Sequence, residues 1–222
     1  MAFPSSLDLM ALIMTSSVLA VSIWSSRTQS LGHPALEATG MDKYSDGDII
    51  RICPKGTEGE SVEIGGLVIS LPATPPKEKI AGYGRPEAMQ LWERVSMPEE
   101  LSRIKSMDEW GEMPREFRQK FSPYIEEEFR RRREGFWFYN NGVPTYITGR
   151  HYMMLQWTRM DIGYPSFLNF QKEIFLHLAA CEADPRCIGQ LYTKCRRSGY
   201  TNICSAVLLD EATQVKDKLL GI

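Results

Sequence analysis

The sequence predicts an α/β protein, in which a mainly helical segment with one β-hairpin precedes a strand–loop–helix unit. Three observations predict this class. β-prone runs lie within residues 49–69, helix signals dominate residues 86–134, and an extended run at 188–193 leads through a loop into a helical stretch. No internal repeat or low-complexity run interrupts this order.

Composition narrows the class of protein further. The 222 residues include 26 Lys and Arg and 28 Asp and Glu, for a net charge of −2. With 43% hydrophobic and 24% charged residues, the chain has the composition of a globular protein, which excludes collagen-like, disordered and multi-span membrane proteins. Because the net charge is near zero, a polyanion must be held by a local basic patch. Five cysteines, an odd number, favour a reducing intracellular setting.

Residues 1–40 are expected to be an N-terminal extension. The uncharged run 9–26 has nearly the length of a membrane span, but Thr and Ser residues dilute it and no Lys or Arg precedes it. A buried or interfacial helix explains the run as well as an extension outside the folded body does. A membrane is therefore not an expected partner.

Residues 41–85 predict a small β element followed by a linker. Ile49, Ile50 and Ile52 form a first extended run, and residues 62–69 are again rich in β-branched side chains. Prolines at 72, 75 and 76 then end the β pattern.

Residues 86–134 predict helices. Pro98 opens one helical segment, and the pair Ser122 and Pro123 has the pattern of an N-cap and first helical residue of another. Glutamates 126–128 each stand four residues before an arginine of 130–132, the spacing of helical ion pairs. These carboxylates neutralise most of the arginine run, so we expect a solvated helix face rather than a DNA-contacting patch.

Residues 135–149 predict a β-hairpin, with Asn141 and Gly142 supplying the positive φ angles of a tight turn. Pro144 cannot donate to the ladder, so its strand is expected at an edge. Two short helices should follow, at 151–160 and 170–181.

Two further clusters are expected to be structural. The aromatic residues of the hairpin and the next helix could stack nucleic-acid bases, but we expect them in the core because few basic residues follow residue 133. His177 and Cys181 share a helix face, yet the spacing to the later cysteines fits no standard zinc site. Buried thiols and a core histidine are the favoured interpretation.

Residues 188–220 have the order strand, loop, helix that a phosphate-binding loop requires. Backbone N–H groups of such a loop and of the helix N-terminus point at anionic oxygens. Gly199 would permit close approach, and the Thr201 hydroxyl stands where it would coordinate Mg²⁺. Residues 186–204 contain Arg186, Lys194, Arg196 and Arg197 and no acid, for a local charge of about +4.

The match to the pattern G-x-x-x-x-G-K-[ST] is incomplete. Lys194 occupies the position of the first glycine, and Tyr200 occupies that of the lysine. A lysine at the start of the loop can still reach the phosphates from its other side. A basic turn on a solvated surface is the alternative.

Residues 194–201 resemble the deviant Walker A segment of the large terminase subunit of tailed phages, in which lysine moves to the loop start and Gly-Tyr-Ser/Thr ends it. Residues 164–171 are similar to the adenine-reading segment of these motors, with Gln171 offering an acceptor and a donor. Residues 146–152 and the region of Trp157 are also similar. The resemblance covers residues 86–222 and implies the N-terminal portion of an ATPase domain, an incomplete P-loop NTPase of the ASCE type.

The resemblance implies roles for particular residues. Gln171 would read the adenine of ATP. Arg196 or Arg197 would be the catalytic arginine that stabilises charge on the transferring phosphoryl group, and spacing does not choose between them. The phosphates and Mg²⁺ would be held by Lys194, Ser198, Gly199, Tyr200, Thr201 and Asn202, with Thr201 as the Mg²⁺ ligand.

Leu208-Leu209-Asp210-Glu211 has the composition of a Walker B motif, but it begins seven residues after Thr201, within the helix that should follow the loop. A Walker B carboxylate must arrive on a neighbouring strand, so we reject this assignment. We expect a chain truncated before Walker B, which would bind nucleotide weakly and hydrolyse almost none alone.

The implied whole machine couples ATP hydrolysis to translocation of double-stranded DNA into a procapsid, in the cytoplasm of an infected bacterial host. Its expected partners are the DNA, the portal protein, the small terminase subunit and further copies of itself in a ring. Two alternatives stay open: another P-loop nucleic-acid ATPase or helicase, and a non-enzymatic protein attached to a membrane through residues 9–26.

Overall fold

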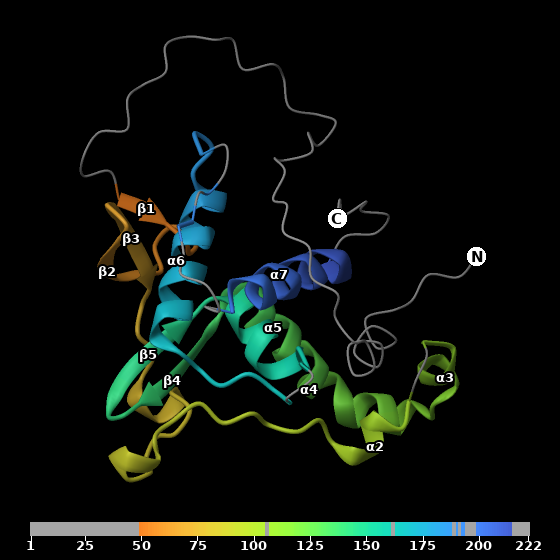
Figure 1. Cartoon of the computed structure of the whole chain (residues 1–222). Coiled ribbons are helices and arrows are strands. Elements are labelled where there is room, and N and C mark those ends of the chain that lie inside the picture. Colours follow the sequence, from red (N-terminus) through yellow and green to blue (C-terminus); the bar gives the residue numbers. More distant parts are fainter. Residues whose placement is uncertain are drawn as a thin grey trace.

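The structure is a computed structural model that describes residues 49–104, 107–160, 163–187, 190, 192–193 and 199–214. In this part of the chain, two small sheets stand beside a group of helices, so the predicted mixture of α and β structure is confirmed (Figure 1). The extension expected at 1–40 and its run 9–26 lie outside the described residues. Among the residues that are described, no helix is both long and apolar enough to cross a membrane.

The first sheet confirms the small β element expected within 41–85. It consists of β1 (Ile49–Arg51), β2 (Glu58–Ile64) and β3 (Leu67–Pro72) in the order β1-β3-β2, with β1 parallel and β2 antiparallel to β3. One face of the sheet packs against α6 (Asn169–Ala183), where Ile69 is fully buried. Two short 3₁₀ helices, η1 (Lys77–Lys79) and η2 (Glu87–Met89), follow in the linker.

The next elements are α2 (Glu99–Ser102), α3 (Met107–Glu112) and α4 (Arg115–Glu134). Pro98 immediately precedes α2, as predicted.

The predicted start of a helix at Ser122 is wrong, because α4 begins at Arg115 and Pro123 lies inside it. Pro123 removes one intrahelical hydrogen bond. The helix continues through it because this part of α4 is packed by an apolar cluster in which Phe121 lies against Leu101 and Ile104. Tertiary packing thus outweighs the local helix-start signal.

The predicted hairpin is confirmed. Strands β4 (Phe136–Asn140) and β5 (Val143–Ile147) pair antiparallel, and Asn141 and Gly142 have φ angles of 49° and 81°. Pro144 lies on β5, an edge strand of this two-stranded sheet. The aromatic residues of the hairpin and of the next helix largely fill the core, as expected; those that are buried are Phe138, Tyr139, Tyr146, Tyr152 and Trp157.

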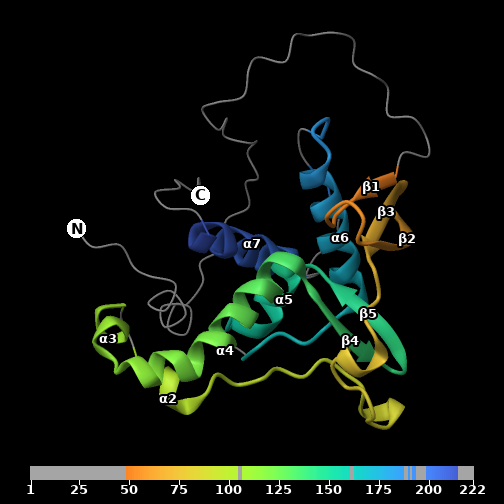
Figure 2. The ribbon, with the colours of Figure 1, turned by 180° about the vertical axis from the view of Figure 1, so that it is seen from behind.

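Three helices complete the described fold: α5 (Gly149–Trp157), α6 and α7 (Tyr200–Gln214). Helix α5 begins where the Thr148 hydroxyl accepts a hydrogen bond from the His151 N–H, and nearly all of its residues are buried. Figure 2 shows α5 between α4 and α7, with α6 extending toward the first sheet. Helix α5 is therefore the central element against which α4, α6 and α7 pack.

Candidate functional site

The candidate site lies at the N-terminus of α7. Gly199 directly precedes the helix and has a φ of 74°, a left-handed conformation that glycine adopts without steric cost. Its carbonyl oxygen accepts the first helical hydrogen bonds, from the N–H groups of Asn202 at 3.0 Å and Ile203 at 3.3 Å. No described atom lies within 4 Å of the point where a Cβ would stand on Gly199. Within the described part of the chain, nothing obstructs the approach of a ligand to this backbone.

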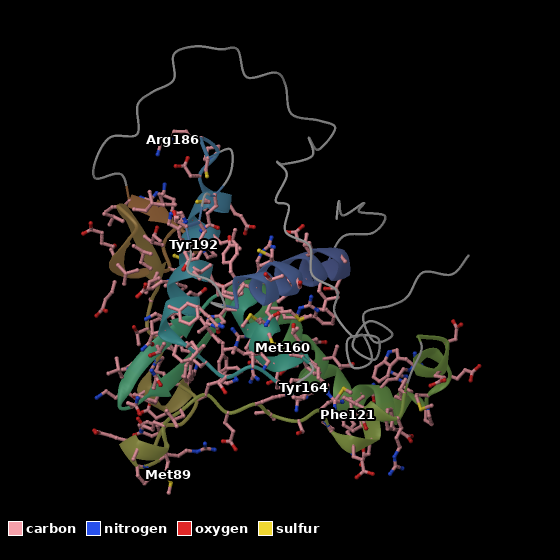
Figure 3. All side chains as sticks on the ribbon, viewed as in Figure 1. Met89, Phe121, Met160, Tyr164, Arg186 and Tyr192 are labelled. Carbon is pink, nitrogen blue, oxygen red and sulfur yellow. The ribbon has the colours of Figure 1, made fainter. Side chains whose placement is uncertain are left out.

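Two tyrosines hold the chain together on either side of residues 194–198. The rings of Tyr192 and Tyr200 are stacked, with centroids 4.7 Å apart and planes at 11° (Figure 3 labels Tyr192). Burial and the neighbouring Cys204 raise the pKa of Tyr200 to about 12, so its phenol is neutral at physiological pH. Tyr192 therefore lies beside the first residue of α7.

Helix α6 packs beside this end of α7. Ile203 of α7 belongs to an apolar cluster with Ile174 and Phe175 of α6, and the Asn202 side-chain amide donates to the Met160 sulfur at 3.5 Å. Gln171 lies one turn before Phe175 on the same helix, is 7% exposed, and has no hydrogen-bond partner on its Oε1 atom among the described residues. A buried acceptor without a hydrogen-bond donor lowers the stability of the folded protein. The Gln171 Oε1 atom could therefore accept a hydrogen bond from a ligand.

The predicted site residues fall into two groups. Gly199, Tyr200, Thr201 and Asn202 are together at the first turn of α7, and Gln171 is on the adjacent helix. The remaining candidates lie outside the described residues: Lys194, Arg196, Arg197 and Ser198.

The flanking secondary structure differs in part from the prediction. Helix α7 starts at Tyr200, two residues earlier than expected, and is described as far as Gln214. In the run 188–193, where a strand was predicted, the described residues Gln190, Tyr192 and Thr193 belong to no strand. The prediction of a strand is therefore wrong for these three residues, which pair with none of the described strands.

Asp210 and Glu211 lie within α7 and are engaged in ion pairs, which agrees with their rejection as a Walker B motif. The guanidinium of Arg132, on α4, donates to Asp210 Oδ1 at 2.8 Å, and both side chains are almost fully buried. Arg150, on α5, pairs with Glu211 and also with Glu182 at 2.9 Å.

The solvated face predicted on α4 is only partly present. Glu127 pairs with Arg131 at the predicted i, i+4 spacing, but Arg132 pairs with Asp210 instead of Glu128. Glu128 is 2% exposed. The prediction was wrong here because Phe121, Glu128 and Arg132 share the buried face of α4. Their spacing of i, i+7 and i+11 is the sequence signal that could have revealed it.

Glu128 anchors α5 to α4. Its carboxylate accepts hydrogen bonds from the Tyr152 hydroxyl at 2.7 Å and the Trp157 indole N–H at 3.2 Å, and it pairs with Arg131 at 3.0 Å. Burial raises the pKa of Glu128, against the opposing effect of these donors. The role is structural, because Tyr152 and Trp157 belong to α5 and their hydrogen bonds to Glu128 hold the two helices together.

The His177 and Cys181 pair does not form a metal site in the described part of the chain, where no group of three His, Cys, Asp or Glu side chains could hold an ion. The Cys181 sulfur lies 3.5 Å from His177 Nδ1, and the Gln190 amide nitrogen lies 2.8 Å from the same atom. Burial raises the pKa of Cys181 to about 12, so the thiol stays protonated. A packing role for this cluster is the simplest interpretation.

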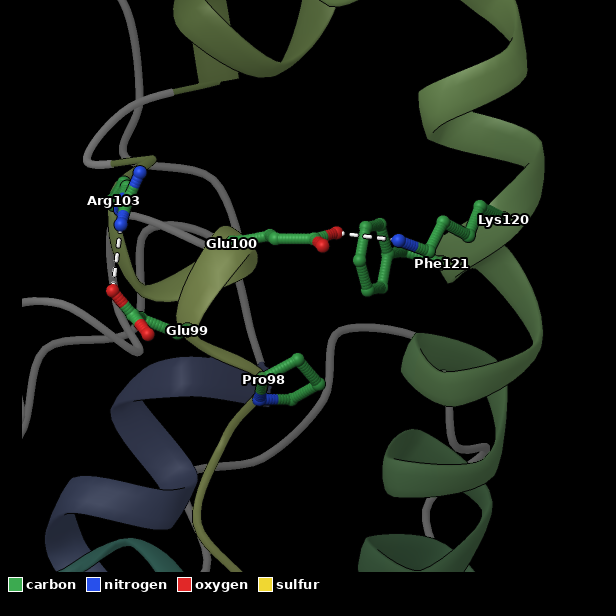
Figure 4. Close-up of a pocket in the computed structure, with 6 residues that line it drawn as sticks. All are labelled: Pro98, Glu99, Glu100, Arg103, Lys120 and Phe121. Carbon is green, nitrogen blue, oxygen red and sulfur yellow. Dashed lines mark hydrogen bonds and ion pairs between the residues drawn. The ribbon is translucent and has the colours of Figure 1, made fainter.

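A pocket of about 520 Å³ lies between α2 and the first half of α4 (Figure 4). Its charges are already compensated, because Lys120 pairs with Glu100 and Arg103 pairs with Glu99, each at 2.6 Å. The pairs are largely exposed, so the pocket provides no buried polar group that would select a ligand.

Comparisons with protein-family models, curated proteins and solved structures find no match to this chain.

Proposed function

We propose that this chain is the ATP-binding part of a viral DNA-packaging motor, the large terminase subunit. The observation that carries the proposal is the backbone at Gly199, which has a positive φ at the start of a helix and stands two residues after the basic segment 194–197 in the sequence. The first N–H groups of a helix have no intrahelical acceptor and lie at the positive end of the helix dipole. Together with the basic segment they favour a di- or triphosphate.

The position of Gln171 supports adenine as the base. Its buried Oε1 atom without a partner can accept a hydrogen bond from the adenine amino group, and its amide can donate to a ring nitrogen. In this proposal Lys194 and the amides of 198–201 hold the phosphates, and Thr201 binds Mg²⁺. Arg196 or Arg197 stabilises charge on the γ-phosphate.

The proposed whole motor moves double-stranded DNA into a procapsid with its portal protein, small subunit and ring partners, in the cytoplasm of an infected bacterium. Steady-state hydrolysis by this chain alone is not part of the proposal. Asp210 and Glu211, the acidic pair that follows the loop, are engaged with Arg132 and Arg150 and do not supply a Walker B carboxylate.

Binding of ATP with Mg²⁺, measured by calorimetry on the full chain, tests the proposal. Wild type should bind weakly, Lys194→Ala should lose most of the affinity, and Thr201→Ala should lose the dependence on Mg²⁺. Lys55→Ala, an exposed lysine in the turn after β1, should leave the affinity unchanged. The absence of binding by wild type, or equal loss in Lys55→Ala, would contradict the proposal.

A further inference from the structure

Helix α7 carries a carboxylate in the middle of its buried stripe. Ile203, Ala206, Val207 and Asp210 are all buried, and their spacing of i, i+3, i+4 and i+7 places them on one face. The first three contact apolar side chains of α5 and α6. The fourth, Asp210, is 0% exposed. An apolar residue would suit this position by pattern, so the carboxylate needs a specific partner.

The partner comes from the last turns of α4. Arg132 has a side chain that is 5% exposed, and one of its terminal nitrogens donates to Asp210 at 2.8 Å and also to the Thr213 hydroxyl. A second arginine, Arg150 of α5, contacts Glu211 on the adjacent position of α7. Two arginines from two different helices therefore hold the C-terminal half of α7.

Buried ion pairs contribute little net stability, because desolvation offsets their attraction, but a single buried polar contact can fix the register of packed helices. The apolar part of the α7 stripe comprises Ile203, Ala206 and Val207, all within the first eight residues of the helix. Beyond them, the buried Asp210 makes the contact with α4. Only one rotation of α7 brings Asp210 to Arg132.

We propose that Arg132 and Asp210 are positioning residues for the first turn of α7: their ion pair fixes the rotation of the helix and thereby the direction of Thr201. This inference rests on the proposed function for its nucleotide readout. Asp210 follows Thr201 by nine residues, which is about 2.5 helical turns and about 14 Å. Thr201 therefore projects from the face opposite to Asp210, and a shift by one residue would turn it by about 100°.

The test replaces the ion pair with apolar residues of similar size, in the double variant Arg132→Met with Asp210→Leu. Hydrogen exchange of the amides in 199–207, measured without nucleotide, should become faster by about fivefold or more, while the melting temperature changes little. Affinity for ATP with Mg²⁺ should fall by a similar factor. The matched control is Arg130→Met with Glu134→Leu, the same exchange in an exposed pair on α4, and it should change neither measurement.

A wild-type protein that binds no nucleotide would contradict the proposed function. The hydrogen-exchange result would still test the role of the ion pair, because exchange is measured without ligand. Unchanged exchange in the folded double variant would overturn the inference. Should that variant not fold, Asp210→Asn decides, because it removes the charge that pairs with Arg132 and keeps the size of the side chain. It should accelerate exchange of the same turn, and unchanged exchange would again overturn the inference.

Discussion

The carbonyl oxygen of Arg132 lies 1.9 Å from the point where a Cβ on Gly149 would stand. The last turns of α4 and the first residue of α5 thus approach as closely as two backbones can, and only glycine fits. The side chain of the same Arg132 donates to Asp210 of α7, so this residue contacts two other helices.

Gly149→Ala should therefore destabilise the protein by roughly 3 kcal/mol, because the obstructing atoms are backbone and cannot rotate away. Urea unfolding followed by circular dichroism measures the change. Gly111→Ala is the matched control, since Gly111 lies in α3 with nothing within 4 Å of its Cβ position. The control should be neutral or stabilising by up to ~1 kcal/mol. Equal effects in both variants would disprove the steric explanation.

His151 should make stability depend on pH. Its ring is fully buried, stacks on Phe175 at 4.7 Å and on Phe167 at 5.7 Å, and has no hydrogen-bond partner on either nitrogen among the described residues. Burial, with a smaller effect of Lys172, lowers the pKa of His151 from 6.5 to about 3. The folded protein therefore holds the imidazole neutral, whereas the unfolded chain takes up a proton below pH 6.5.

This stabilisation is fully present above about pH 6.5 and is lost as the pH falls from there toward 3. Between pH 7 and pH 5 the loss should be about 2 kcal/mol. His151→Phe keeps the ring stack and removes the titrating group. Between pH 7 and pH 5, the free energy of unfolding of this variant should therefore fall by about 2 kcal/mol less than that of wild type. His177, whose pKa burial also lowers, contributes in the same direction in both proteins. Parallel pH profiles for wild type and variant would refute the assignment.

Glu128→Gln should destabilise the fold by about 2 kcal/mol, because Tyr152 and Trp157 both donate to Oε2 and Arg131 donates to Oε1. An amide that keeps the first acceptor turns its NH₂ group toward the Arg131 guanidinium and loses that ion pair. Chemical denaturation at pH 7 measures the effect. Glu126→Gln, the same change on the exposed face of α4, should stay within about 0.5 kcal/mol of wild type. A loss no larger than that of the control would show that the buried carboxylate is dispensable.

Much of the fold was predictable because its signals are local. Asn141 and Gly142 specify the hairpin turn through their backbone preferences, and the run at 62–69 specifies the sheet. The start of α4 was mispredicted because Ser122 and Pro123 have the sequence pattern of a helix start. The helix continues through Pro123 because Phe121 packs against Leu101 and Ile104, a contact between residues far apart in the sequence.

In the candidate site, the sequence predicted only those positions that follow from local sequence pattern. Gly199 and Thr201 are placed at a helix N-terminus by sequence alone, as observed. The contact between Arg132 and Asp210 joins residues 78 positions apart, so no local pattern shows it. A charge at a position with core spacing is the only trace of such a contact in the sequence, and Asp210 has that spacing within α7.

Gln171 and Gln156 provide the sharpest comparison between a binding role and a structural one. Both are buried, but Gln156 exchanges hydrogen bonds with the backbone N–H and carbonyl of Val95, whereas the Oε1 atom of Gln171 has no partner among the described residues. Gln156→Met leaves two backbone groups unpaired and should cost about 2 kcal/mol. Gln171→Met removes an unpaired acceptor and should be neutral or slightly stabilising.

If Gln171 reads adenine, the same Gln171→Met variant should lose its preference for ATP over GTP. Its stability should be retained, because the amide would bind the ligand and would not stabilise the fold. Thermal unfolding and competition binding on one preparation measure both quantities. A destabilisation of Gln171→Met as large as that of Gln156→Met would show that the Gln171 amide serves the core. The adenine assignment would then lose its structural support, because it depends on that acceptor being unused by the protein itself.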